Sequence, residues 1–145
     1  MKKLILLTFL CFSLQINANE KINFSDPKTV VYYINKTMNF PVPVDEYTEL
    51  KSVSLVKEET LMYSLNVINN ELINNFNDKI KGPVYVNAFR NSTCNNIDYH
   101  KILREIDSDS ILVEFIAGTK KIQYRIFKSL LSQDDVSKCS VDIIN

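Results

Sequence analysis

The stretch that decides the fold begins at Cys94, ends at Cys139 and reads CNNIDYHKILREIDSDSILVEFIAGTKKIQYRIFKSLLSQDDVSKC. In its first part, apolar residues recur at the i, i+3, i+4, i+7 spacing of one helical face: Tyr99, Ile102, Leu103 and Ile106. Asn95, with Asp98 three residues later, supplies an N-cap. The spacing therefore predicts a helix over 95–106.

Two alternating apolar runs follow this helix, over 111–117 and 122–127, and alternation of this kind is typical of strands. Gly118 and Thr119 lie between the runs, and glycine at the first central position suits a two-residue type II′ turn. A disulfide between Cys94 and Cys139 would hold the helix start to the end of this hairpin. Closing a loop of roughly 45 residues stabilises a fold by about 4 kcal/mol on chain-entropy grounds.

The N-terminus predicts export. Residues 1–3 are basic at Lys2 and Lys3, residues 4–14 form a short apolar core, and Ala18 offers a small residue for cleavage. We interpret residues 1–18 as a signal peptide that directs the protein to the periplasm or to secretion, and we expect Cys11 to leave with it. Cys94 and Cys139 then remain in an oxidising compartment, where they admit a single pairing.

The remaining chain, residues 19–145, has 127 residues, which suits one domain. Without Lys2 and Lys3 its charges fall from 17 basic and 17 acidic to 15 and 17, a net charge near −2. With no basic cluster in the sequence, this balance argues against nucleic acid or an anionic membrane as the main partner. No later apolar run is long enough to cross a bilayer, so we expect a protein that does not span the membrane.

The composition also excludes several chemistries. His100 is the only histidine, so a histidine-rich zinc site cannot be built. Gly82 and Gly118 are the only glycines, which excludes glycine-rich phosphate and dinucleotide loops. We therefore predict no metal and no cofactor.

The N-terminal half predicts a helix, a hairpin and a second helix. Ser25-Asp26-Pro27 is a helix start, and the apolar spacing continues it over 27–38. Alternation over 52–67 predicts a hairpin that turns at Lys57-Glu58-Glu59. Helical spacing over 69–81 must stop or kink at Gly82-Pro83. Residues 84–93 fit either a strand or a helix with Pro83 at its first position, and periodicity does not decide between them.

Three motifs, in this order, carry a resemblance. Residues 41–53, PVPVDEYTELKSV, fit Pro-x-x-Val-Asp-x-x-Thr-x-Leu-x-x-Val; Thr60-Leu61-Met62-Tyr63 follows; Cys94 then stands at a helix start, with the apolar hairpin and Cys139 behind it. The chain resembles, over roughly 40–139, a family of short uncharacterised secreted proteins of proteobacteria. The resemblance implies a helix that runs into the first cysteine, which favours helix for 84–93, although Gly82-Pro83 departs from that pattern. It implies no particular activity.

The motif contains residues that carry either structure or chemistry. Asp45 with Thr48 favours an Asx-type turn at a strand entrance over catalysis, because no second catalytic group is evident, and Pro41 and Leu50 belong to the same motif. His100 falls off the apolar face of its helix, so we expect a solvated residue and not a general base. The wide spacing of the two cysteines favours a structural disulfide over a redox pair.

Tyrosine is abundant for so small a chain, and tyrosine is favoured at interfaces. Any tyrosine on an open face of the sheet is a candidate for binding. The three candidates are Tyr47, Tyr63 and Tyr124.

The whole pattern predicts an α+β domain with one mostly antiparallel sheet of four strands, formed by two hairpins, with helices packed on one side and one disulfide. The leading functional hypothesis is a small non-enzymatic periplasmic or secreted protein that binds an envelope or extracellular macromolecule. A second is an inhibitor or immunity-type protein of a cell-wall hydrolase, acting through Glu58 and Glu59. A third is a hydrolase built on carboxylates such as Asp45. The sequence names neither the partner nor the oligomeric state.

Overall fold

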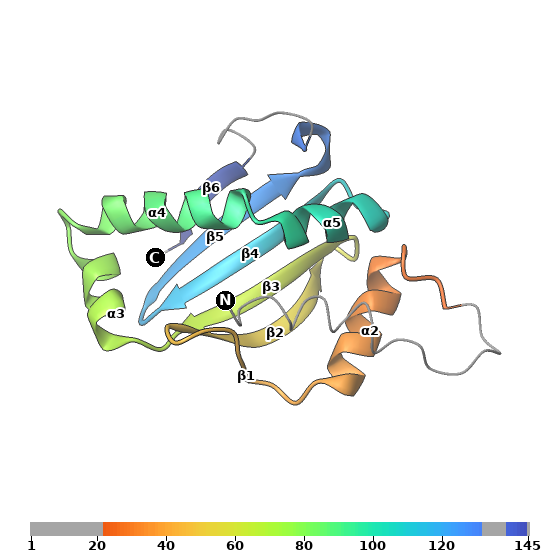
Figure 1. The fold of residues 1–145 in the computed structure, drawn as a ribbon, viewed down its shortest axis with the longest axis horizontal. Coiled ribbons are helices and arrows are strands. Elements are labelled where there is room, and N and C mark those ends of the chain that lie inside the picture. Colours follow the sequence, from red (N-terminus) through yellow and green to blue (C-terminus); the bar gives the residue numbers. More distant parts are fainter. Residues whose placement is uncertain (1–21, 132–138, 145) are drawn as a thin grey trace.

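The computed structural model describes residues 22–131 and 139–144, so the predicted signal peptide over 1–18 lies outside the described residues. Within the described residues, six strands form one sheet in the order of the sequence (Figure 1). They are β1 (Val42–Pro43), β2 (Thr48–Val56), β3 (Thr60–Val67), β4 (Ser110–Ala117), β5 (Lys120–Phe127) and β6 (Cys139–Ile144). The helices are α2 (Pro27–Thr37), α3 (Asn70–Asn77), α4 (Gly82–Cys94) and α5 (Ile97–Glu105), with a short 3-10 helix, η1 (Lys128–Leu130).

The α+β class, both predicted hairpins (β2–β3 and β4–β5) and a mostly antiparallel sheet are confirmed, but the sheet has six strands where four were predicted, and one pair is parallel. β3 and β4 are parallel, from the pair Leu61 and Ile111 to the pair Asn66 and Ile116. The reason is the connection: after β3 the chain passes through three helices and re-enters the sheet at the end where β3 began, as a parallel crossover requires. β1 and β6 are edge strands that the sequence did not predict.

The hydrophobic core lies between the four helices and one face of the sheet. Alternate side chains of the three central strands face the helices: Leu61, Tyr63, Leu65, Val67, Ile111, Val113, Phe115, Ala117, Ile122, Tyr124 and Ile126. The helices add Ile34, Phe76, Val86 and Leu103 to the same cluster. Each large apolar side chain buried in this way contributes about 1.5–3 kcal/mol. The layered arrangement is visible in Figure 1, where α4 and α5 cross the strands.

Residues 84–93 are helical, within α4, and the preceding helix α3 ends at Asn77, earlier than predicted. Asp78 ends α3 because its backbone is extended and its Oδ1 accepts hydrogen bonds from the backbone N–H groups of Ile80 (2.8 Å) and Lys81 (2.7 Å). Gly82 then packs so closely that an added Cβ would lie 2.8 Å from the carbonyl oxygen of Phe76. The residues 78–81 and the start of α4 therefore form a sharp, fixed corner.

The disulfide between Cys94 and Cys139 is confirmed. It joins the last residue of α4 to the first residue of the edge strand β6, with a Cα–Cα distance of 5.8 Å. Both cysteines are buried. Arg90, one turn earlier in α4, donates from Nη2 to the backbone carbonyl of Cys139 (3.2 Å), so a second contact holds the same two elements together.

The β4–β5 hairpin turns at Gly118, which has a φ of 66°, whereas Thr119 is not among the described residues with a positive φ. One positive φ at the first central position is typical of a type II′ turn, as the sequence predicted. The Gly118 position is also crowded, because an added Cβ would lie 3.2 Å from Cγ2 of Ile73 in α3. The hairpin end therefore packs against α3.

Candidate functional site

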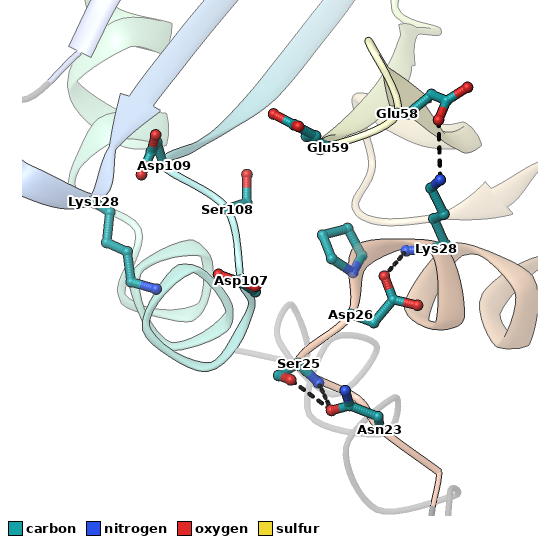
Figure 2. Close-up of a pocket in the computed structure, with 11 residues that line it drawn as sticks. Asn23, Ser25, Asp26, Lys28, Glu58, Glu59, Asp107, Ser108, Asp109 and Lys128 are labelled. Carbon is teal, nitrogen blue, oxygen red and sulfur yellow. Dashed lines mark hydrogen bonds and ion pairs between the residues drawn. The ribbon is translucent and has the colours of Figure 1, made fainter.

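The candidate functional site is a hollow of about 490 Å³ at the end of the sheet where β3 and β4 begin. Three segments that are distant in the sequence form most of its walls: residues before and at the start of α2, the β2–β3 turn, and the loop between α5 and β4 (Figure 2). Lys128, at the start of η1, adds a fourth. We name it the acidic hollow after the five carboxylates that line it: Asp26, Glu58, Glu59, Asp107 and Asp109. Lys28 and Lys128 are the two lysines among the lining residues.

The start of α2 forms one wall. Asp26 is the N-cap, and its carboxylate accepts from the backbone N–H groups of Lys28 (3.2 Å) and Thr29 (3.3 Å). The Thr29 hydroxyl also donates to it (2.8 Å), and this bond is the main cause that lowers the pKa of Asp26. Asp26 is thus held as a carboxylate by the helix that it caps.

An ion pair links this wall to the β2–β3 turn. Lys28 Nζ lies 3.0 Å from Glu58 Oε2, and this hydrogen bond raises the pKa of Lys28. Both side chains are well exposed, so the pair adds little to stability. Its effect on the hollow is to neutralise one of the two lysines with one of the five carboxylates.

The β2–β3 turn has an unusual backbone. Lys57 and Glu58 both have positive φ, 52° and 64°, and the N–H of Glu59 bonds to the carbonyl of Val56 (3.3 Å). Residues other than glycine adopt this left-handed conformation at a cost of roughly 1–2 kcal/mol each. The conformation places Glu58 and Glu59 on the rim of the acidic hollow, as Figure 2 shows.

The loop between α5 and β4 is tied down at several points. The N–H of Asp107 bonds to the carbonyl of Ser25 (2.6 Å), and the N–H of Lys128 bonds to the carbonyl of Asp109 (2.8 Å). Lys128 Nζ donates to the carbonyl of Ile106 (2.8 Å), so its ammonium group is already engaged by the backbone. The loop therefore carries its two aspartates on a fixed support.

The acidic hollow carries a net negative charge. Within residues 22–131 and 139–144, the carboxylates of Glu59, Asp107 and Asp109 make no hydrogen bond and no ion pair. Lys28 is already paired with Glu58, and Lys128 is bonded to the carbonyl of Ile106. Five carboxylates against two lysines leave the lining with a net charge of −3. A concave surface of one sign concentrates ligands of the opposite sign, so the acidic hollow suits a cationic group.

The motif that contains Asp45 lies at the other end of β2 and takes no part in the hollow. Asp45 Oδ1 accepts from the N–H of Tyr47 (2.8 Å), the N–H of Thr48 (2.9 Å) and the hydroxyl of Thr48 (3.0 Å). This geometry is an Asx-type turn at the entrance to the strand. Pro41 follows a cis peptide bond before β1, and Leu50 is buried in the core.

The three candidate tyrosines are not brought together. Tyr63 and Tyr124 lie on the sheet face that the helices cover, with 2% and 0% of their surface exposed, and the Tyr124 hydroxyl donates to the carbonyl of Val86 (2.8 Å). Neither side chain is accessible to a binding partner, because both form part of the core. Tyr47 is 39% exposed and is the candidate of the three that a partner can contact.

The prediction for His100 is wrong. His100 is buried, and its Nε2 lies 2.6 Å from the carbonyl oxygen of Cys94. A carbonyl only accepts, so Nε2 carries the proton and donates. The helix was expected to expose this side chain, but only Asn95 and Asn96 separate α4 from α5, and the ring lies against the last carbonyl of α4. His100 thus ties the two helices together beside the disulfide.

Sequence reasoning identified Glu58 and Glu59 as acidic loop residues but missed Asp26, Asp107 and Asp109. Asp26 was recognised only as part of a helix start. No local pattern connects the three segments, because they meet only when the parallel pairing of β3 and β4 places the two loops at the same end of the sheet.

Comparison of the chain with family models, with curated proteins and with solved structures finds no match. Among the described residues, no group of three or more histidine, cysteine, aspartate or glutamate side chains is arranged to hold a metal ion. None of the helices over those residues has the length and apolar character needed to cross a membrane.

Proposed function

We propose that this chain is an exported binding protein that holds a cationic segment of an envelope or extracellular macromolecule in the acidic hollow. The observation that carries the proposal is the convergence of five carboxylates from three segments around one hollow. Three of these carboxylates make no ion pair with any described residue. The signal-peptide pattern over 1–18 and the disulfide support action outside the cytoplasm.

A protein partner fits this site best. Lysine and arginine side chains are long enough to enter a hollow of this size while their neighbours contact the rim. The unpaired carboxylates come from the β2–β3 turn and from the loop before β4, so a bound cation would contact two separate walls. Contacts with exposed carboxylates are worth about 0.2–1 kcal/mol each, and three of them together correspond to a change in affinity of roughly 3-fold to 150-fold.

Affinity capture from the envelope fraction tests the proposal. The variant that carries Glu59→Gln, Asp107→Asn and Asp109→Asn removes three charges from the acidic hollow with little change in shape. The matched control removes three exposed charges elsewhere: Glu46→Gln, Glu71→Gln and Asp142→Asn. We expect one main partner to bind to the wild type and to the control and to bind the hollow variant roughly 3-fold to 150-fold more weakly. Equal capture by all three forms would refute the proposed site.

One observation also favours the second hypothesis, that the protein inhibits a cell-wall hydrolase. Glu58 and Glu59, which the inhibitor hypothesis invoked, lie on the rim of the acidic hollow and project from a hairpin turn. A protruding acidic turn is suited to entering the cleft of a basic hydrolase. Lysozyme is the simplest target, and inhibition that is lost in Glu59→Gln would favour this role. Lysozyme activity that an excess of the protein leaves unchanged would remove this simplest version.

Catalysis by carboxylates is the least supported of the three roles. Asp45, the residue on which that hypothesis was built, uses one carboxylate oxygen to organise its own turn and lies far from the acidic hollow along β2. We expect Asp45→Asn to retain any activity of the protein, since the amide oxygen can accept the same bonds.

A further inference from the structure

A second surface of this protein lies at the opposite end of the sheet, where α3 meets α4. In Figure 1 this corner stands at one end of the molecule, and the β2–β3 turn that borders the acidic hollow lies at the opposite end of the sheet, beside α2. Ile80 is 85% exposed, the largest value among the exposed large apolar residues, and Val84 is 67% exposed. Pro83, between them in the sequence, is exposed as well. Single exposed apolar residues are ordinary, but an apolar group at a protruding corner marks a contact surface.

The apolar group is flanked by lysines from two parts of the chain. Lys79 and Lys81 stand on either side of Ile80, and both are exposed. Lys120, at the start of β5, reaches the same corner: its Nζ donates to the carbonyl of Phe76 (2.9 Å) and lies 3.6 Å from where a Cβ on Gly82 would be. The sequence shows no basic cluster because this one forms only when the β4–β5 hairpin packs against α3.

The corner is rigid. The hydrogen bonds from Ile80 and Lys81 to the Asp78 carboxylate fix the turn, and the N–H of Gly82 bonds to the carbonyl of Asp78 (2.9 Å). The Asp78 carboxylate therefore serves the backbone, while the ammonium groups of Lys79 and Lys81 make no ion pair with the described residues. Ile80 is consequently held outward and does not fold back onto the protein.

We propose that this corner is a docking surface for an anionic phospholipid bilayer, with Ile80 and Val84 entering the headgroup region and the exposed Lys79 and Lys81 meeting lipid phosphates. Apolar side chains and nearby cations act together in binding of this kind, since burial of apolar area and attraction to anionic lipids add. The lipid is the occupant that the charge of the corner fits. Docking through this end leaves the acidic hollow directed away from the membrane. The proposal does not rest on the function proposed above.

Vesicle co-sedimentation tests the proposal with the full protein. Wild type is mixed with vesicles of phosphatidylcholine alone and with vesicles that contain phosphatidylglycerol, at low and at physiological salt. We expect binding to the anionic vesicles that weakens as salt is added. Ile80→Asp should lower the partition coefficient at least about tenfold, as should the double variant Lys79→Glu/Lys81→Glu. Both changes are at exposed positions, so neither should impair folding.

Ile97→Asp is the matched control. Ile97 is 57% exposed, lies at the first position of α5 away from the corner, and stands where a carboxylate is favourable for a helix. It should bind vesicles as the wild type does. The variant with a neutralised acidic hollow should also bind normally, which separates this proposal from the proposed function. The proposal would be overturned if the wild type did not bind anionic vesicles, or if Ile80→Asp bound them equally well. It would also be overturned if the wild type formed a dimer that Ile80→Asp abolished while neither bound vesicles, because the corner would then be a contact between copies of the chain.

Discussion

Removal of the disulfide between Cys94 and Cys139 is the perturbation whose energetic effect can be worked out most fully. The crosslink closes a loop with a sequence separation of 45. For a loop of that length, the lost entropy of the unfolded chain corresponds to about 4 kcal/mol at 25 °C. Net stabilities of small domains are about 5–15 kcal/mol, so a large share of the stability is involved.

We expect Cys94→Ala/Cys139→Ala to lower the free energy of unfolding by about 4 kcal/mol. With a urea m-value near 2 kcal/mol per molar, the midpoint should fall by about 2 M. The melting temperature should fall by roughly 12–20 °C for a chain of this size. Urea unfolding followed by circular dichroism measures the change directly.

The reduced wild type is the control for packing. It keeps both buried sulfur atoms and loses only the bond, so it should resemble the double variant. Because both cysteines are buried, reduction requires prior unfolding in denaturant with reductant. A reduced protein that unfolds within about 1 kcal/mol of the oxidised form would refute the account of the disulfide as a structural crosslink.

Three further predictions concern the turn at Asp45, the buried tyrosines and Gly118. Asp45→Ala should lower the free energy of unfolding by about 0.5–2 kcal/mol because three donors lose their acceptor, and Asp45→Asn should restore most of it in the same urea assay. Burial raises the pKa of Tyr99 and of Tyr124, so the folded protein keeps two protons that the unfolded chain releases near pH 10. The free energy of unfolding that these two protonated tyrosines contribute is fully present below pH 10 and should fall by about 2.7 kcal/mol per pH unit above it, which urea titrations would measure. Absorbance at 295 nm should show that both tyrosines ionise only when the protein unfolds. Gly118→Ala should destabilise by about 1–2 kcal/mol because φ is 66° there, and an unchanged urea midpoint would count against the turn assignment.

Local signals in the sequence predicted the elements well. Pro27 after Asp26 marked the start of α2, Gly118 marked the second hairpin, and the pairing of Cys94 with Cys139 followed from the cysteine count. Each of these depends on a few neighbouring residues or on simple counting. The prediction for 84–93 needed the resemblance to favour helix, because the apolar spacing there fits two periods.

The features that the sequence did not predict depend on contacts between distant segments. The parallel pairing of β3 and β4 follows from a connection through three helices, and no property of either strand alone specifies it. His100 is buried because its ring contacts the last carbonyl of α4, whereas the helical face of its own segment alone placed it in solvent. The acidic hollow and the lysines around Ile80 each combine segments that the fold brings together. Charge counted along the sequence therefore hid two surfaces of opposite sign.

An NMR titration of the isotope-labelled protein with a tetralysine peptide at low salt shows directly whether the acidic hollow binds cationic groups. We expect the largest shift changes at the backbone amides of Glu59, Asp107 and Asp109, and their loss in the variant that neutralises these carboxylates. The amides of the α3–α4 corner should not respond, because that surface is basic. No localised change, or changes equally large in the neutralised variant, would contradict the claim that the acidic hollow is a binding site for cationic groups.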